Sequence, residues 1–230
     1  VKGRFRLWVH ITDVSHFIVE GTALDDEARL RATSVYFPDC VYPMLPPKLS
    51  NGILSLNPQE DRLTLTLEMT FDTEGNQIDY KIYESVIHSN ERMTYTAVHE
   101  ILENPSPPLL KRYESLVASF KEMKSLALLL RRKRLMRGSL DFDLPEQDIV
   151  LDSEGSVINI LKTERNIAHQ LIEEFMLVAN ETVARHIEAR ALPSQESYPF
   201  LYRVHAPPSP ERIAELNEWL TAFGFPLPQQ

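Results

Sequence analysis

The sequence predicts an α+β fold in which a mixed sheet of mostly antiparallel strands packs against several helices. Two observations lead to this expectation. The first half of the chain carries segments in which apolar and polar residues alternate, whereas long segments with helical periodicity dominate the second half. Hydrophobic residues make up 43% of the 230 positions, which is enough for a packed core in one large domain or two small ones.

Three segments in the first half predict strands. Residues 4–11 alternate between apolar and polar side chains, and residues 63–71 do the same. Residues 77–87 follow the turn signal "DTEGN" (72–76), so we expect them to return antiparallel to residues 63–71. On one face of the first two strands, the alternation places these apolar residues: Phe5, Leu7, Val9 and Ile11, then Leu63, Leu65, Leu67, Met69 and Phe71.

The stretch "TSVYFPDCVYPMLPPKLSNGILSLNP" (33–58) separates the first strand from the second. It holds five prolines and several aromatic side chains. Proline removes an amide donor and fixes the backbone, so this composition excludes a helix or a central strand. We therefore expect a stiff loop that is unusually rich in apolar side chains.

Helical periodicity and end signals predict five helices. They cover residues 24–34, 94–104, 110–138, 164–190 and 209–225. Thr94 and Ser209 are suitable N-caps, Pro210 occupies a first helical position, and Gly138 closes the third helix. Between the third and fourth helices, residues 142–161 are expected to form two short strands around the turn "SEGS".

Composition and motif searches exclude several classes of function. The net charge of −9 argues against general attraction to nucleic acid, so RNA binding would need a local basic channel. Cys40 is the only cysteine, which excludes an intrachain disulfide and fits a reducing compartment such as the cytoplasm. No apolar run approaches the ~18 residues of a membrane span, and we expect no signal peptide. The scattered histidines, the lack of a glycine-rich phosphate loop and the lack of a nucleophile elbow disfavour the corresponding chemistries.

The predicted helix 164–190 has an unusual polar face. Its apolar stripe is formed by Ile167, Leu171, Phe175, Met176 and Val178. Beside the stripe lie mostly uncharged polar side chains: Asn166, His169, Gln170, Glu173 and Asn180. Such a face is either ordinary solvated surface or a hydrogen-bonding wall. Glu174 lies close to the apolar stripe, so we expect it to be partly buried.

Two further features leave alternatives open. Tyr36, Phe37 and Tyr95 are suited to stacking on nucleic-acid bases, but the same rings could fill gaps beneath the proline-rich loop. The "RRKR" run (131–134) could contact phosphates, although cations are common at helix C-termini. From the residues alone, the prediction ends at a soluble α+β domain with a possible stacking site.

Four motifs, in order along the chain, carry a family resemblance. They are residues 6–69, which include the proline-rich stretch, "RMTY" (92–95), "RGSLDFDLPE" (137–146) and "ERNIAHQLIEEFMLVAN" (164–180). Together they resemble the catalytic domain of the ribonuclease II / ribonuclease R family, and they look closer to the ribonuclease R branch. The resemblance covers nearly the whole chain.

The resemblance implies a 3′-to-5′ exoribonuclease that hydrolyses single-stranded RNA to nucleoside 5′-monophosphates with Mg²⁺. It implies that Tyr36 stacks on bases near the 3′ end from a rigid channel wall, that Tyr95 packs against the terminal nucleotide, and that Phe142 lines the channel. It further implies that Glu173 orients that nucleotide through the ribose hydroxyl. Single-stranded RNA is the expected partner, DNA and membranes are not, and the expected compartment is the cytoplasm.

One departure from the family pattern limits these implications. The aspartate cluster that holds the metal ions, and the arginine segment near the C-terminal end, have no counterpart in the sequence. We therefore expect residues 1–230 to be a single partial catalytic domain of the RNB type, inactive by itself. The alternatives are a non-catalytic RNA-binding or scaffold pseudo-nuclease and an unrelated protein-interaction domain.

Overall fold

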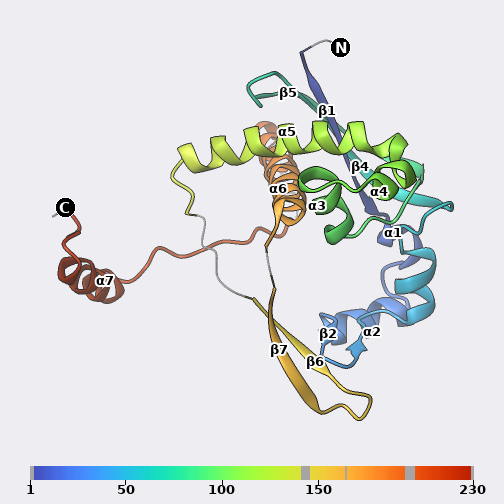
Figure 1. The fold of residues 1–230 in the computed structure, drawn as a ribbon, viewed down its shortest axis with the longest axis horizontal. Coiled ribbons are helices and arrows are strands. Elements are labelled where there is room, and N and C mark those ends of the chain that lie inside the picture. The colour runs from blue at the N-terminus through green and yellow to red at the C-terminus, as the bar shows by residue number, and fades with distance from the viewer. Residues whose placement is uncertain (1–2, 141–145, 164, 195–199, 229–230) are drawn as a thin grey trace. The chain divides into compact units, whose positions relative to one another are not determined.

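The computed structural model of the chain describes residues 3–140, 146–163, 165–194 and 200–228 (Figure 1). These residues fall into two compact units, Val1–Thr182 and Val183–Gln230. The first unit contains all the strands together with helices α1 to α5 and the N-terminal part of α6. The α+β class predicted from the sequence is confirmed.

A three-stranded antiparallel sheet forms the centre of the first unit. The strands β1 (Phe5–Thr12), β4 (Asp61–Phe71) and β5 (Gln77–His88) lie in the order β1-β4-β5. The turn between β4 and β5 closes because the Asp72 carboxylate accepts hydrogen bonds from the backbone amides of Glu74 and Asn76. The three predicted strands, and the hairpin formed by β4 and β5, are therefore confirmed.

The two ends of β4 bury opposite faces. Toward its C-terminal end Leu67, Met69 and Phe71 are buried, as predicted. Toward its N-terminal end Thr64 and Thr66 are buried instead, and Leu65 is exposed, so the expectation that Leu65 shares the buried face is wrong. The same holds for Ile11 on β1, which is also exposed.

The C-terminal part of the proline-rich stretch explains this change of face. Thr12 Oγ1 donates to the carbonyl of Leu54 at 2.7 Å, and Arg62 Nε donates to the carbonyl of Ser55 at 2.8 Å. These bonds hold that segment against the sheet. Next to it, His10, Thr64, Thr66 and Ser85 form a polar cluster, in which His10 Nδ1 lies 2.7 Å from Thr66 Oγ1. Burial lowers the pKa of His10.

The proline-rich stretch contains more regular structure than a loop. A short antiparallel ribbon is formed by β2 (Val35–Tyr36) and β3 (Val41–Tyr42). It is followed by a π-helical turn, η1 (Lys48–Ile53), which the sequence analysis did not predict. Upstream of the ribbon lie α1 (Val14–Phe17) and α2 (Ala23–Arg31).

Three helices follow the central sheet. They are α3 (Tyr95–Glu103), α4 (Pro107–Arg112) and α5 (Glu114–Met136). The helix is interrupted at Tyr113, between α4 and α5, whereas the sequence predicted one continuous helix over this region. Tyr113 has ψ of 24° and is buried in a cluster with four other residues, so packing of its ring accompanies the break. The cluster consists of Val98, Ile101, Tyr113, Phe120 and Ala168.

The remaining elements agree with the sequence predictions. The hairpin of β6 (Glu146–Leu151) and β7 (Val157–Thr163) forms a separate two-stranded sheet. The helix α6 (Ile167–Ser194) follows it, and α7 (Pro210–Ala222) in the second unit begins at the predicted cap Ser209. In the described part of the chain, no helix combines the length and the apolar character needed to cross a membrane.

Candidate functional site

The candidate site lies on the first two turns of α6. Asn166 caps this helix, because its Oδ1 accepts hydrogen bonds from the backbone amides of Ala168 at 3.0 Å and His169 at 3.4 Å. Two positions after Asn166, Ala168 is buried in the cluster that also contains residues of α3 and α5. A satisfied cap and a buried anchor therefore fix the position of the helix start, and with it the side chains of the site.

Tyr95 and His169 form a stacked pair across two helices. Their ring centroids are 4.0 Å apart and the planes differ by 19°. Tyr95 is the first residue of α3, where Thr94 caps the helix by accepting from the Ala97 amide at 3.2 Å. His169 Nδ1 lies 2.9 Å from Asn166 Oδ1, so the imidazole is held from its other side. Tyr95 remains 47% exposed, which leaves part of the ring available for a ligand.

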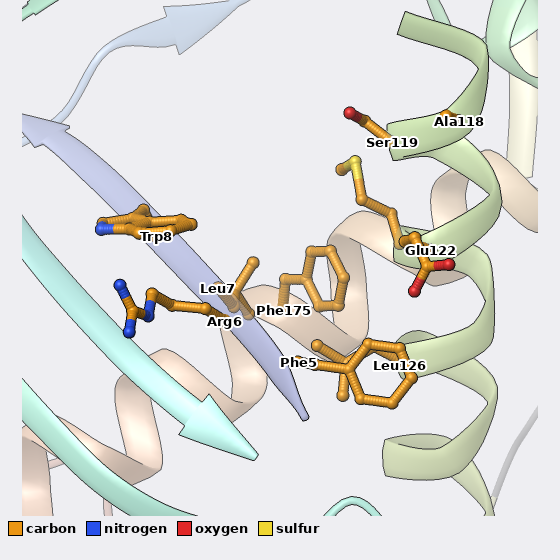
Figure 2. Close-up of a pocket in the computed structure, with 10 residues that line it drawn as sticks. Phe5, Arg6, Leu7, Trp8, Ala118, Ser119, Glu122, Leu126 and Phe175 are labelled. Atoms are coloured by element: carbon orange, nitrogen blue, oxygen red, sulfur yellow. The ribbon is translucent and has the colours of Figure 1, made fainter. Parts of the chain in front are cut away.

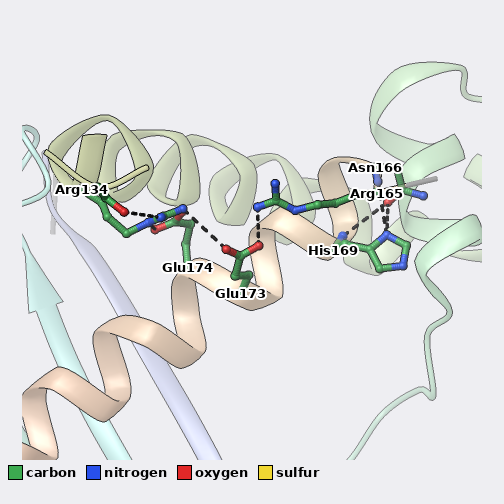
Figure 3. A network of polar contacts seen from close by, with 7 residues as sticks. Arg134, Arg165, Asn166, His169, Glu173 and Glu174 are labelled. Atoms are coloured by element: carbon green, nitrogen blue, oxygen red, sulfur yellow. Dashed lines mark hydrogen bonds and ion pairs between the residues drawn. The ribbon is translucent and has the colours of Figure 1, made fainter. Parts of the chain in front are cut away.

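Glu173 lies one helical turn beyond His169 and contacts two arginines. Its Oε2 is 2.5 Å from Arg165 Nη2, and its Oε1 is 3.6 Å from Arg134 Nη2 (Figure 3). The side chain is 37% exposed. Glu173 is thus a carboxylate with solvent access whose two oxygens face two different guanidinium groups.

Glu174, next in sequence, forms a buried ion pair with the same Arg134. Arg134 Nη2 donates to Glu174 Oε1 at 2.6 Å, and Arg134 Nε donates to the same oxygen at 3.0 Å. The Glu174 side chain is only 4% exposed and that of Arg134 13%, so Glu174 is buried more completely than the partial burial expected from the sequence. Removing one partner of such a pair leaves an uncompensated buried charge, which costs about 3–5 kcal/mol.

The site offers an aromatic surface and a hydrogen-bond acceptor, but it does not fit a metal ion. In the part of the chain that the structure describes, no three histidine, cysteine, aspartate or glutamate side chains gather where they could hold one. Glu173 and Glu174 are adjacent carboxylates, yet both are already paired with arginine. The chemistry open to these residues is therefore stacking and acceptance of hydrogen bonds.

The structure brings two of the four predicted site residues together. Tyr95 and Glu173 are linked through His169, because Tyr95 stacks on a residue one turn before Glu173. Tyr36 lies on the β2–β3 ribbon, is 76% exposed, and has no contact with Tyr95 or Glu173 among the interactions of the described residues. Phe142 falls outside the described residues.

Sequence reasoning missed both arginines of the site. The sequence left two interpretations of the "RRKR" run open, phosphate contact or cations at a helix C-terminus, whereas Arg134 from this run is largely buried against Glu174. Arg165 lies just before the predicted polar face, eight residues ahead of Glu173. Because helical neighbours are three or four positions apart, this spacing did not point to the pair. Elsewhere on α6, the prediction that Met176 belongs to the buried stripe is wrong, because Met176 is exposed.

A separate cavity of about 430 Å³ lies between β1, α5 and α6 (Figure 2). Its lining is mainly apolar and includes Phe5, Leu7, Leu126 and Phe175. The charged residues at its margin do not converge on one point in Figure 2. A ligand site normally combines an apolar wall with a few convergent polar groups, so the α6 site is the better candidate.

Comparison with known proteins agrees with the fold. The RNB domain family matches residues 1–229. The ribonuclease R of Aquifex aeolicus is 45% identical over 97% of this chain and 31% of its own length. The structure of Mycoplasma genitalium RNase R, in complex with ribose-methylated single-stranded RNA, gives a TM-score of 0.89 at 34% identity, covering 100% of this chain and 35% of that one. Yeast Ssd1, a pseudonuclease, gives 0.75 at 20% identity, covering 100% and 27%, which shows a likeness of fold alone.

The fold and the site thus define an α+β domain of the kind found in ribonucleases and in a pseudonuclease. This chain belongs to the RNB domain family. It spans about a third of the length of the curated relative it matches.

Proposed function

We propose that this chain forms the part of a 3′-to-5′ exoribonuclease that holds the 3′ end of single-stranded RNA. Membership of the RNB domain family and the similarity to ribonuclease R support this proposal. In this function the α6 site receives the terminal nucleotide, and the parent protein releases nucleoside 5′-monophosphates one at a time.

One observation carries the proposal: Tyr95 stacks on His169, and Glu173, which is partly exposed, lies one helical turn after His169. An aromatic ring binds any base by its π-face, and each stacked base contributes about 1–3 kcal/mol. A carboxylate one helical turn away accepts a hydrogen bond from a ribose hydroxyl, which is the group that separates RNA from DNA. Tyr95 is therefore assigned to the base and Glu173 to the sugar.

Tyr36 and Phe142 are proposed to contact nucleotides farther from the end. Tyr36 is exposed on the short ribbon of the proline-rich stretch, so its ring is available for stacking. The role of Phe142 rests on the family resemblance alone. With Tyr36 and Phe142 included, the proposed channel wall contacts more than one nucleotide of the RNA.

Mg²⁺ is the proposed cofactor. Its ligands are proposed to lie outside these 230 positions. Residues 1–230 are proposed to form one partial catalytic domain. Divalent metals supply an activated water and neutralise charge in phosphodiester hydrolysis. The residues described here bind and orient RNA. The proposed compartment is the cytoplasm, which fits the single cysteine.

A non-catalytic RNA-binding protein is the second candidate. The observation behind it is that the same fold occurs in yeast Ssd1, a pseudonuclease. The two functions differ in the sequence just before this domain: a cluster of aspartates there favours an enzyme, and its absence favours a pseudo-nuclease.

The test uses the full-length protein that carries this chain and an oligoribonucleotide labelled at its 5′ end. With Mg²⁺ we expect the labelled RNA to shorten stepwise from its 3′ end, with release of 5′-monophosphates. Substitution Tyr95→Ala should lower the rate about tenfold or more, because stacking of the terminal base is lost. RNA binding without shortening would favour the pseudo-nuclease, and neither binding nor shortening would contradict both candidates.

A further inference from the structure

The Glu173 carboxylate is oriented by two arginines that come from different parts of the chain. Arg165, just before α6, reaches Oε2 at 2.5 Å, and Arg134, on α5, faces Oε1 at 3.6 Å. Figure 3 shows the Arg165 side chain running along α6 toward Glu173, while Arg134 approaches from the other side. Because each oxygen faces a different cation, rotation of the carboxylate about its terminal bond is opposed.

The second of these arginines is itself fixed. Arg134 donates from Nε and Nη2 to the buried Glu174, and from Nη1 to Ser139 Oγ at 2.9 Å. A guanidinium has a rigid planar fork, so bonds to both ends set the plane of the group. Arg134 is therefore held in one orientation. Arg165, which is more exposed than Arg134, is the second arginine that contacts Glu173.

Charge gives a second reason for this arrangement. A bare carboxylate would repel the phosphates of an approaching RNA end, and this repulsion is large where water is partly excluded. The two guanidinium groups offset that charge. Only Arg165 is close enough to donate a hydrogen bond to Glu173, so part of its hydrogen-bonding capacity stays open, because a carboxylate has about four lone-pair positions. Glu173 is 37% exposed and can still accept a hydrogen bond from outside.

We propose that Arg165 is a positioning residue for recognition of the ribose at the RNA 3′ end, acting by orienting Glu173 against the fixed Arg134. This inference rests on the proposed function, in which Glu173 accepts from the terminal ribose. Arg165 does not need to touch the RNA. Its contribution is the orientation of the acceptor, which must be held within about 0.5 Å to select one geometry.

The experiment compares two RNA substrates in the full-length protein that carries this chain. They are identical except that one ends in a ribose and the other in a 2′-deoxyribose. For wild type and variants, single-turnover rates give the preference for the ribose end. The variants are Arg165→Met, Arg165→Lys and Glu173→Gln. The matched control is Arg137→Met, which removes a similar arginine–glutamate pair (3.1 Å, with Glu181) between the end of α5 and a later part of α6.

We expect Arg165→Met to lower the ribose preference about tenfold, as expected for a charge-assisted hydrogen bond whose acceptor has lost its orientation. Glu173→Gln should lower it at least as much, Arg165→Lys should restore part of it, and Arg137→Met should leave it unchanged. A purely structural role of Arg165 would slow both substrates equally and leave their ratio intact.

The outcomes separate this inference from the proposed function. If wild type prefers the ribose end and Arg165→Met keeps that preference while Glu173→Gln loses it, the positioning role is overturned and the proposed function stands. If Arg165→Met and Arg137→Met lower the ratio equally, the effect is general loosening and the inference is again overturned. If wild type shortens RNA with no ribose preference, the role of Glu173 fails and the inference fails with it.

Discussion

The α6 site and the β2–β3 ribbon both carry a tyrosine suited to stacking, but they hold it in different ways. Tyr95 stands at a capped helix start and is stacked on His169, which is bonded in turn to the cap of α6. Tyr36 lies in a ribbon of two residue pairs and is 76% exposed. Under the proposed function, the end of the RNA would meet a pre-oriented site, whereas Tyr36 would supply an adaptable contact farther along.

The largest expected effect removes the support of the α6 site. Substitution Arg134→Met leaves Glu174 buried without its partner, so the free energy of unfolding should fall by about 3–5 kcal/mol. Denaturant unfolding followed by circular dichroism measures this change. Arg137→Met, which breaks an exposed pair, should cost about 1 kcal/mol or less. Equal losses in the two variants would contradict the claim that Arg134 is the buried anchor.

The next effect separates the two tyrosines by their products. Tyr95→Ala should weaken binding of the RNA end by about 1–3 kcal/mol and slow every step of shortening. Tyr36→Ala should mainly change the length at which shortening stops, because the ribbon is proposed to contact nucleotides away from the end. Gel analysis of the final products measures both. Identical product lengths and rates in wild type and Tyr36→Ala would remove Tyr36 from the channel.

A smaller effect tests how Tyr95 is held. Substitution His169→Ala removes the ring on which Tyr95 stacks, a contact worth about 0.5–1.5 kcal/mol. We expect weaker binding of the RNA end by a similar amount, with the preference for a ribose end retained. Fluorescence anisotropy with ribose-ended and 2′-deoxyribose-ended oligonucleotides measures both quantities. Unchanged affinity would show that Tyr95 keeps its place without His169.

The smallest effect concerns the sheet face that packs beside the C-terminal part of the proline-rich stretch. Burial lowers the pKa of His10 in the folded state, so the unfolded chain takes up a proton first as the pH falls below about 6.5. Stability should therefore be unaffected by His10 above that pH and should decrease from there down to the folded pKa. Unfolding at pH 7 and pH 5 should show a smaller loss in His10→Asn than in wild type. A larger loss in the variant would contradict this sign.

Much of the fold could be predicted because local signals determine it. The alternating strands, the "DTEGN" turn and the caps Thr94 and Ser209 act within a few residues, and each is found where expected. The exposure of Leu65 and the break at Tyr113 depend on distant partners, namely the Leu54 segment and the Val98 cluster. Alternation and periodicity do not contain that information.

The candidate site was predictable to a similar extent. Helical spacing placed His169 and Glu173 on one face, and the family resemblance added Tyr95. The pairing of Arg134 was not predicted, because Arg134 and Glu174 are forty positions apart in sequence. Only the packing of α5 against α6 brings these two residues together. Long-range ion pairs of this kind leave no periodic signal in a single sequence.

The central claim is that Tyr95 and Glu173 grip the same terminal nucleotide, and a double-mutant cycle tests it most directly. Affinity for a ribose-ended oligonucleotide would be measured in the full-length protein for Tyr95→Ala, Glu173→Gln and the double variant, with a parallel cycle for Tyr36→Ala and Glu173→Gln. We predict a coupling energy of about 1 kcal/mol between Tyr95 and Glu173, and additivity within about 0.5 kcal/mol between Tyr36 and Glu173. Additive effects of Tyr95 and Glu173 would contradict a shared nucleotide.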